Sequence, residues 1–567
     1  MNSKQLREIF LKFFQKNGHK ILPPSSLVPE NDPTVLFTTA GMQQFKDYYI
    51  HPQKAPAQNI ATCQPCVRTS DIELVGDDSH LTFFEMLGNF SFGGYFKEVA
   101  IKYAYEFLTK DLAISHERIS VGVFAGDKDI PLDQESESYW KLLKIPEEKI
   151  KKLGRDELFW GPTGAQGPCG PTSEIYVDKV EVWNLVFNEY YYKDGKLSPL
   201  QTPGVDTGVG FERLLAVLNA PPAGGQGKKT VYETDLFENL KLKVQNLKEG
   251  AEDERKIRII CDHIRAITFL LAEGILPSNK AQGYVLRRLI RRAKVFGQLL
   301  GVEGIFLPQL AQIVVDEMGE VYPLLAKNKD EIEKNLKEEE ERFEKTLATG
   351  LKELERRIKD NELSGKDAFV LYDTFGFPLE LTQELAGQKG VKIETDEFEK
   401  LMGEQKERAR ASAEIFTKRE ANPRLHTAAH LLHKTLQEVL GPNALQRGQD
   451  ITGEVLRFDF SHPSKLSEEE LGKIEKIVQE KIAANLPVQT IETTLQEAKK
   501  LGATALFYQK YGDKVTLYYI GRDLESAFSK ELCGGPHAKN TSEIDQFKII
   551  SEKSAGSGIR RIKAKVD

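Results

Sequence analysis

"VDTGVGFERLLAVL", residues 205–218, combines a glycine-rich segment with an apolar run of helical character. The pattern predicts a strand, a tight turn and a helix. Gly208 and Gly210 let the backbone come close to a flat or charged ligand, because glycine has no side chain. Arg213 would then lie beside a phosphate or stack on a purine ring. This is not the dinucleotide fingerprint, since an arginine replaces the third glycine and no βαβ unit precedes it. An ordinary strand–turn–helix is the alternative.

A second segment, "CVRTSDIELVGDDSHLTFFEMLGNFSFGGYFK" at 66–97, is typical of a β-hairpin with a polar loop. Arg68 leaves the first strand, and Glu85 and Met86 lie on the second. Arg68 on this hairpin and Arg213 on the glycine-rich element would together clamp a triphosphate. The two segments therefore predict one nucleotide site.

Length and texture predict several domains. The 567 residues are too many for one ordinary core, so we expect about three domains. From about residue 20 to 220, short apolar and aromatic runs alternate with Gly/Pro turns, which indicates a sheet-centred domain. "NAPPAGGQGKK" at 219–229 is typical of a loop. Helical periodicity follows it, and mixed α/β texture returns towards the C-terminus.

Composition excludes several classes of protein. Hydrophobic residues make up 40% and charged residues 29%, values typical of a globular protein in water. No apolar run approaches the roughly 20 residues that cross a bilayer, so we expect no membrane segment. Five cysteines, an odd number, favour a reducing compartment, with the cytoplasm as the default. The net charge of −7 gives no global sign of nucleic-acid binding, which depends on local basic patches instead.

The helical middle contains a candidate basic patch. "GYVLRRLIRRAK" at 283–294 predicts a helix whose arginines form a stripe. The alternative is a solvated face paired with neighbouring acids. A second periodic segment, 328–358, carries the glutamate run 338–341, which we expect on a solvated face. Its predicted apolar stripe consists of Ile332, Leu336, Phe343, Leu347, Leu351 and Leu354.

Histidines and a cysteine near the C-terminus predict a metal site. "HTAAHLLH" at 426–433 places His426 and His430 one helical turn apart. "CGGPH" adds Cys533 and His537. Three imidazoles and a thiolate are tetrahedral zinc ligands by type and number. His433 is a reserve ligand or packs beside the site. A zincin peptidase is not expected, because H-E-x-x-H is absent.

Several ordered strings carry a family resemblance: "LVPENDPTVLFTTAGMQQF", "TFFEMLGNFSFG", "GPCGP", "WNLVF" and "VDTGVGFER". They resemble motifs 1, 2 and 3 of class II aminoacyl-tRNA synthetases, and in particular the alanyl-tRNA synthetase family. The likeness covers nearly the whole chain. It implies an α+β multidomain fold: a class II-like antiparallel sheet with helices at 1–235, an all-helical tRNA acceptor-stem domain at 236–420, and an α/β zinc-dependent editing domain at 421–567.

The resemblance implies roles at the first site. Arg68 would hold the ATP α-phosphate, and Arg213 would stack on adenine and reach the γ-phosphate. Asp206 would pair with the ammonium group of alanine, although a turn-capping role is its alternative. Mg²⁺ would accompany ATP, and no general base is required. The implied ATP-binding residues are Arg68, His80, Glu85, Met86, Gly208, Gly210 and Arg213, and the alanine-binding residues are Trp160, Val186, Asp206 and Gly208.

The resemblance also implies contacts with RNA. Asn279 and Asp373 look like the family's pair of residues that approach the G·U wobble pair of the acceptor stem, where the minor groove is accessible. Phosphate contacts would come from Arg287, Arg288, Arg291 and Arg292.

The strings "LHTAAHLLHKTL", "LQRG", "LRFDFSH", "GATALF" and "CGGPH" resemble the family's editing domain. Gln446 would orient substrate there, and Cys533 would lie near the terminal adenosine of the tRNA. The implied catalytic residues of the two sites are Arg68, Asp206, Arg213, Cys533 and Gln446, and the implied zinc ligands are His426, His430, Cys533 and His537.

The expected activity is that of an alanine–tRNA ligase, which activates alanine with ATP, charges tRNA(Ala), and hydrolyses Ser-tRNA(Ala) and Gly-tRNA(Ala). The alternatives are a synthetase-like binder without activation and a zinc-dependent esterase of mischarged tRNA. Three features depart from the family: no β-barrel precedes the editing domain, no C-terminal extension follows it, and Pro536 replaces the usual threonine. The first two predict a compact, monomeric enzyme.

Overall fold

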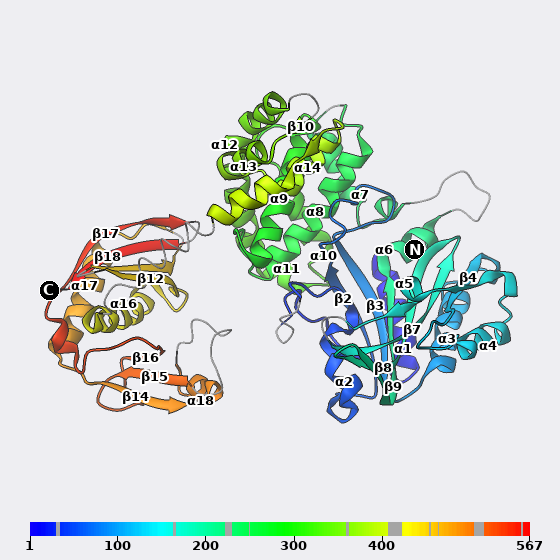
Figure 1. Ribbon diagram of the computed structural model, residues 1–567, viewed down its shortest axis with the longest axis horizontal. Coiled ribbons are helices and arrows are strands. Elements are labelled where there is room, and N and C mark those ends of the chain that lie inside the picture. Colours follow the sequence, from blue (N-terminus) through cyan, green and yellow to red (C-terminus); the bar gives the residue numbers. More distant parts are fainter. Residues whose placement is uncertain are drawn as a thin grey trace. The chain divides into compact units, whose positions relative to one another are not determined.

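The computed structural model describes residues 1–29, 35–162, 166–220, 230–248, 250–358, 362–405, 422–452, 455–462, 464–503, 515–556 and 559–566. Most of the predicted loop at 219–229, the predicted boundary at 420/421 and residues 504–507 of "GATALF" lie outside these ranges. The chain forms two compact units, 1–398 and 399–567 (Figure 1).

A mostly antiparallel sheet organises the first half of unit 1. Its strand order among the described residues is β1-β2-β3-β9-β8-β7-β4-β5, with β6 paired to β7. Only the pairs β1–β2 and β4–β5 are parallel in this sheet. The strands are β1 Lys20–Ile21, β2 Asn59–Val67, β3 Phe83–Phe92, β4 Ile119–Phe124, β5 Ile150–Leu153, β6 Phe159–Trp160, β7 Gly167–Val177, β8 Val180–Lys193 and β9 Lys196–Gly210.

Strand register brings the predicted motifs together. The predicted hairpin is β2–β3, and the predicted strand–turn–helix is β9 followed at once by α6, Phe211–Asn219. Because β9 lies between β3 and β8, the position of Asp206 pairs with Phe90 on one side and Val186 on the other. A Cβ added at Gly208 would lie 2.8 Å from the Met86 sulfur, so glycine is needed for this close approach.

Helices surround the sheet and then build the rest of unit 1 (Figure 1). Those associated with the sheet are α1 Ser3–Lys16, α2 Lys46–Ile50, α3 Lys97–Glu106, α4 Gln134–Leu142 and α5 Arg155–Leu158. The helical part comprises α7 Glu238–Leu247, α8 Glu254–Ala272, α9 Ala281–Leu299, α10 Leu307–Met318, α11 Pro323–Lys327, α12 Lys329–Arg357, α13 Gly365–Phe375 and α14 Leu379–Gly387, with the short strands β10 Glu362–Leu363 and β11 Lys392–Ile393.

One hydrophobic core joins the sheet to the helical part. It runs from Leu6 and Phe10 of α1 through the strands to Ile264 of α8 and Leu336 of α12. Continuous burial of this kind explains why 1–235 and the helical part up to residue 398 form a single compact unit. The division of this unit into two domains stays a prediction.

The long helix α12 confirms its predicted apolar stripe and corrects one expectation. Five stripe residues are buried and Leu351 is half-buried. The glutamate run is not entirely on a solvated face, because Glu339 and Glu340 are buried. Glu339 pairs with Arg291, and the carboxylate of Glu340 accepts hydrogen bonds from the backbone N–H groups of Phe306 and Leu307. The arginine and the two backbone N–H groups therefore compensate for the burial of these two glutamates.

The described residues of unit 2 form two antiparallel sheets and two long helices. The four-stranded sheet has the order β12-β13-β18-β17, and the three-stranded sheet β14-β15-β16. Helix α16 contacts both sheets, and α17 packs on β17 (Figure 1). The elements are α16 Pro423–Leu440, β12 Gln446–Thr452, β13 Val455–Ser461, α17 Glu468–Ala483, β14 Val488–Thr493, α18 Leu495–Lys500, β15 Val515–Ile520, β16 Ser529–Leu532, β17 Phe547–Gly556 and β18 Ile559–Val566. The expected α/β texture of this region is confirmed.

Candidate functional site

A cavity of about 270 Å³ opens on the face of the sheet formed by β3, β9 and β8. The hairpin supplies one side of it and the start of α6 supplies another. Nine of the ten residues predicted to bind ATP or alanine line this cavity: Arg68, His80, Met86, Trp160, Val186, Asp206, Gly208, Gly210 and Arg213. Residues drawn from 68 to 213 in the sequence thus meet in one place.

Asp206 is a buried carboxylate without a partner. Its side chain is 5% exposed, and within the described part of the chain it makes no ion pair or hydrogen bond. Burial raises the pKa of Asp206 to about 8. Val186, on the adjacent strand position, is also buried. A buried acid beside a small apolar wall is suited to an ammonium group that carries a small side chain.

Arg68 and Arg213 both line the cavity, but they have different partners. Arg68 donates from Nε to the Thr39 carbonyl at 3.3 Å and lies 5.0 Å from the centre of the Phe84 ring. Arg213 donates to Glu181 at 3.0 Å and is about one third exposed. Since Glu181 also lines the cavity, an anion that reaches Arg213 would compete with this ion pair.

Glu85, the tenth predicted residue, does not line the cavity. Its side chain is fully buried and receives two hydrogen bonds from Arg7, at 2.7 and 2.5 Å, and one from Tyr322. The Cys63 thiol also donates to it. Glu85 therefore joins β3 to α1 and to the helical part of unit 1. An ATP contact is not supported by this placement, because its acceptor oxygens already have donors.

Asn184 is a cavity residue that sequence reasoning missed. Its side-chain nitrogen donates to Glu174 at 3.3 Å, whereas its buried oxygen has no partner among the described residues. Asn184 and Val186 share a strand face because they are two residues apart, and Asn184 pairs in register with Gly208. Alternation along "WNLVF" was the signal that could have found it.

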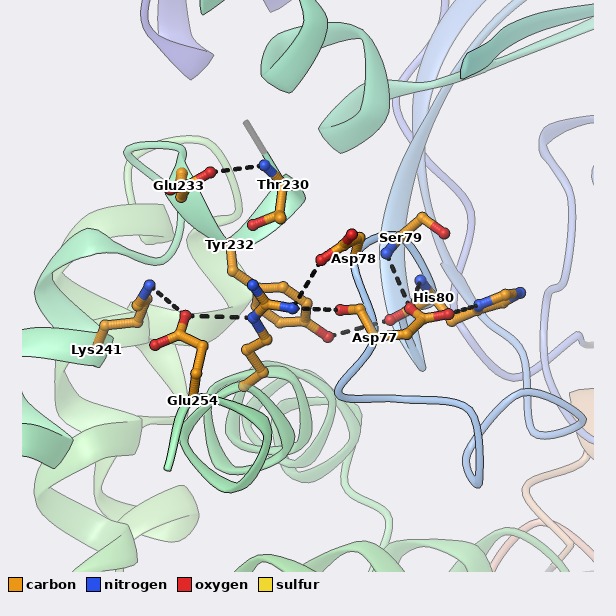
Figure 2. A network of polar contacts seen from close by, with 10 residues as sticks. Asp77, Asp78, Ser79, His80, Thr230, Tyr232, Glu233, Lys241 and Glu254 are labelled. Carbon is orange, nitrogen blue, oxygen red and sulfur yellow. Dashed lines mark hydrogen bonds and ion pairs between the residues drawn. The ribbon is translucent and has the colours of Figure 1, made fainter. Parts of the chain in front are cut away.

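The hairpin loop is held in place by the helical part of unit 1. Arg258 on α8 donates to the Asp77 carbonyl at 3.1 Å and to the Asp78 carboxylate at 3.0 Å. Tyr232 donates to the His80 carbonyl at 3.1 Å. The Asp77 carboxylate in turn accepts from the His80 N–H at 2.7 Å and contacts the His80 imidazole at 2.5 Å. Figure 2 shows these loop residues beside Tyr232, whose hydroxyl is joined to the His80 carbonyl. The cavity-lining His80 is thereby oriented from both sides.

The predicted RNA-reading residues lie on the surface of unit 1. Asn279 precedes α9 and is exposed, and Asp373 is exposed near the end of α13. Arg287 donates a hydrogen bond to the Asn279 side-chain oxygen. Both polar side chains are thus accessible, as a minor-groove contact requires.

The four arginines of α9 lie in ion pairs rather than on an open basic surface. Arg292 is the extreme case, because its side chain is 2% exposed and pairs with Glu384 at 2.6 Å. Phosphate contact by this stripe stays a prediction, and a phosphate would have to compete with the acids that already pair with these arginines. The other pairs join Arg287 and Arg291 to Glu339, and Arg288 to Glu73 of the hairpin loop.

The four predicted zinc ligands gather in unit 2. His426, Cys533 and His537 offer ligand atoms within 4.8 Å of one another. The His430 ring centre lies 4.6 Å from that of His537. Burial raises the pKa of the Cys533 thiol, but hydrogen bonds from the three histidines outweigh it and lower the pKa to about 3. A thiolate, and buried nitrogens of His426 and His537 without partners among the described residues, fit a zinc ion.

Glu531 is a second residue that sequence reasoning missed. Its carboxylate accepts from His433 Nδ1 at 3.0 Å and faces His430 Nδ1 at 3.7 Å. The backbone N–H of Gln446 donates to the other nitrogen of His433 at 3.2 Å. His433 therefore bridges Glu531 and Gln446. The signal in the sequence was the two-residue spacing of Glu531 and Cys533, which places both on one side of an extended segment.

Comparison with known proteins shows the family of the chain. Residues 5–459 match the model of class II tRNA synthetases (A), and residues 515–563 match that of the threonyl and alanyl tRNA synthetase second additional domain. The alanine–tRNA ligase of Borreliella afzelii is 44% identical over 603 aligned residues, which cover 100% of this chain and 99% of that protein. The alanine–tRNA ligase of Treponema pallidum is 42% identical over 605 residues, with 100% and 98% covered.

Two further comparisons differ in extent. The alanine–tRNA ligase of Dehalococcoides mccartyi (strain BAV1) is 38% identical, with 99% of this chain and 80% of that protein covered. Among solved structures, S. aureus histidyl-tRNA synthetase matches with a TM-score of 0.26 at 14% identity, over 38% of this chain and 66% of that one.

The chain belongs to the class II tRNA synthetases (A). Within that class, its similarity to alanine–tRNA ligases over the full chain confirms the predicted resemblance and the predicted enzyme class. The α+β multidomain fold with an antiparallel class II sheet is confirmed as well. Within the described residues, none of the helices has the length and apolar character of a membrane span.

Proposed function

We propose that this chain is an alanine–tRNA ligase that forms alanyl-adenylate, transfers alanine to tRNA(Ala), and hydrolyses Ser-tRNA(Ala) and Gly-tRNA(Ala) at a separate zinc-containing site. The observation that carries the first part is Asp206, a buried carboxyl group without a partner among the described residues, beside Val186 in a cavity also lined by Arg68 and Arg213. Burial raises the pKa of this carboxyl to about 8, so that its ionised form requires a cationic partner, and the ammonium of a small amino acid supplies it. The reaction is inferred from the family to which the chain belongs.

The first reaction depends on alignment and charge. A carboxylate oxygen of alanine attacks the α-phosphorus of ATP, the bond to the bridging oxygen breaks, and pyrophosphate leaves. No general base is needed, because the attacking carboxylate is already ionised. Asp206 would hold the ammonium while Arg68 and Arg213 neutralise the phosphates. Magnesium would enter with ATP, and Asp71 and Glu181 offer carboxylate oxygens in the cavity.

In the second reaction, a ribose hydroxyl of the tRNA terminal adenosine attacks the carbonyl carbon of the adenylate, and AMP leaves. Asn279 and Asp373 would recognise the G·U wobble pair that marks the acceptor stem. The catalytic domain at 1–235 would perform the chemistry, and the helical domain at 236–420 would present the stem. Such an enzyme would act in the cytoplasm, where all three substrates are available.

The editing site at 421–567 would compensate for the limited amino-acid selectivity of the first site. A cavity for one methyl group distinguishes alanine from glycine or serine by only about 1–3 kcal/mol, so misacylated tRNA must be removed afterwards. His426, His430, Cys533 and His537 would hold zinc, which would supply a fixed positive charge beside the ester. Gln446 would orient the mischarged end, with its backbone anchored by His433.

Alanine-dependent ATP–pyrophosphate exchange tests the proposal. The ligase shows exchange and charges tRNA(Ala), whereas a tRNA binder or a zinc esterase shows neither. Exchange by the wild-type chain that is equal with and without alanine would reject the ligase. A charging assay with alanine, serine and glycine, on tRNA with and without the wobble pair, then tests the editing and recognition parts separately.

A further inference from the structure

The four-stranded sheet of unit 2 has one apolar face and one basic face. Leu456, Phe458, Ile562 and Ala564 point into the core on the side covered by α16 and α17. Because side chains alternate along a strand, their neighbours point to the opposite side. We call this side the outer basic face, and its cationic residues are Arg457 on β13, Arg561, Lys563 and Lys565 on β18, and Lys548 and Lys553 on β17.

Strand register places like charges directly opposite one another on this face. Lys548 lies opposite Lys565. Lys563 lies opposite Arg457 on its other side. Lys553 likewise lies opposite Arg561. Directly opposed like charges destabilise an antiparallel pair, so folding gives no reason for this arrangement.

The lysines of the outer basic face are not neutralised within the chain. Arg561 is held by two hydrogen bonds of 2.7 Å to Asp459, and Arg457 lies 3.5 Å from Asp450. In contrast, the side chains of the four lysines have no ion pair or hydrogen bond among the residues that the structure describes. Three of them, Lys548, Lys553 and Lys565, are exposed, and Lys563 is half-buried. With adjacent strands about 4.8 Å apart, these charges form one compact patch.

We propose that the outer basic face is a docking surface for the phosphate backbone of RNA. The inference rests on the proposed function, in which a tRNA must be held while its end is hydrolysed in unit 2. Lysines provide flexible point charges that contact phosphates without reading sequence. A membrane is a poorer partner, because Ile550 is the one exposed large hydrophobic side chain among the described residues of unit 2.

The test removes three of these charges together. In Lys548→Ala/Lys563→Ala/Lys565→Ala, the log–log dependence of the tRNA association constant on salt becomes shallower by roughly 2, since each lost phosphate contact removes about 0.7–0.9 from the slope. The matched control is Lys465→Ala/Lys473→Ala/Lys476→Ala, which removes three exposed lysines before and on α17. The triple arginine variant of positions 548, 563 and 565 keeps the wild-type slope. All are measured on the full chain by fluorescence anisotropy.

Several results would overturn the proposal. These are an unchanged slope in the triple alanine variant, an equal change in the control, or an arginine variant that behaves like the alanine one. Binding of phosphatidylserine vesicles or polyglutamate that depends on these lysines, with tRNA binding independent of them, would assign the face to another partner. If the triple variant unfolds, Lys565→Ala alone must make the slope shallower by about 0.8.

The readouts also separate this inference from the proposed function. Exchange of ATP and pyrophosphate involves no RNA, so the triple variant retains the wild-type rate and thereby reports an intact unit 1. Hydrolysis of Ser-tRNA(Ala) shows a KM raised several-fold with kcat unchanged. Wild-type protein without exchange rejects the ligase, whereas intact exchange with an unchanged salt slope rejects only the docking surface.

Discussion

Val186 and Asp206 occupy paired positions on adjacent strands, so that an apolar wall and a buried acid lie side by side in the same cavity. We expect Asp206→Asn to abolish measurable alanine-dependent exchange, because loss of a buried charge pair costs about 2–5 kcal/mol of binding free energy. The variant should fold normally, since asparagine is close in size to the neutral, protonated carboxyl of the empty site at pH 7. A melting temperature lowered together with exchange would show a structural role instead, and hydrolysis of Ser-tRNA(Ala) should persist as the internal control.

The ionisation of Asp206 makes alanine binding pH-dependent. Burial raises the pKa of this carboxyl to about 8 from its ordinary 3.8, so the empty site is largely protonated at pH 7. An ammonium group binds the ionised form, and affinity should therefore rise with pH up to about 8 and then level off. Calorimetry with a non-hydrolysable alanyl-adenylate analogue in buffers of different ionisation enthalpy should detect release of a proton at pH 7. No proton release there would contradict the assignment.

The raised pKa of Asp206 also makes the free energy of unfolding depend on pH, but this free energy falls as pH rises, whereas alanine affinity increases. The folded state retains a proton that the unfolded chain releases above pH 3.8, so the contribution of Asp206 to the free energy of unfolding falls as pH rises from about 4 to 8. Denaturant unfolding of wild type and Asp206→Asn should give curves that separate over this range. Parallel curves from pH 4 to 8 would show that the carboxyl titrates normally.

Arg258 should act through the hairpin loop that it holds. Arg258→Ala removes hydrogen bonds to Asp77 and Asp78, and charged hydrogen bonds are worth about 1.5–3 kcal/mol each. We expect the KM for ATP to rise about tenfold in the exchange assay, with the KM for alanine unchanged. Lys256→Ala, on the same helix and paired with Asp253, is the control. Equal increases in both KM values would indicate general damage rather than positioning of His80.

Glu531 should strengthen zinc binding by orienting histidines rather than by binding the metal itself. Because it orients His430 and His433, Glu531→Gln should lower zinc affinity by about 10–100-fold, measured by competition with a chelating dye. Glu525→Gln, at an exposed position nearby, should have no effect. Zinc removal by a chelator should abolish editing and leave exchange intact, whereas loss of exchange on chelation would place the metal elsewhere.

Arg292 should contribute to stability rather than to RNA binding. It is buried against Glu384, and breaking a buried pair costs about 3–5 kcal/mol. Arg292→Ala should therefore lower the free energy of unfolding by that amount. Arg342→Ala, which removes an exposed partner of Glu339, should cost far less. A steep loss of tRNA affinity in Arg292→Ala without destabilisation would restore the predicted phosphate contact.

Sequence alone predicted part of the lining of the nucleotide and amino-acid cavity and missed other lining residues, such as Asn184. Strand alternation, glycine spacing and family strings identified nine of its lining residues, and the four metal ligands were set by type and helical spacing. Short-range periodicity decides which side chains share a face, whereas the roles given to these residues came from the family resemblance.

Only the tertiary structure decided what faces those side chains. Glu85 lies on the predicted strand, yet its carboxylate accepts hydrogen bonds from Arg7 and Tyr322, which are 78 and 237 residues away. Acidic residues distant in sequence likewise pair with the arginines of α9, and Arg258 holds the loop that carries His80. In unit 2, Glu531 contacts two histidines of a helix about 100 residues earlier in the sequence. Periodicity tells which way a side chain points, but its charge state and availability depend on the group that packs opposite, and that group is chosen by the assembly of the core.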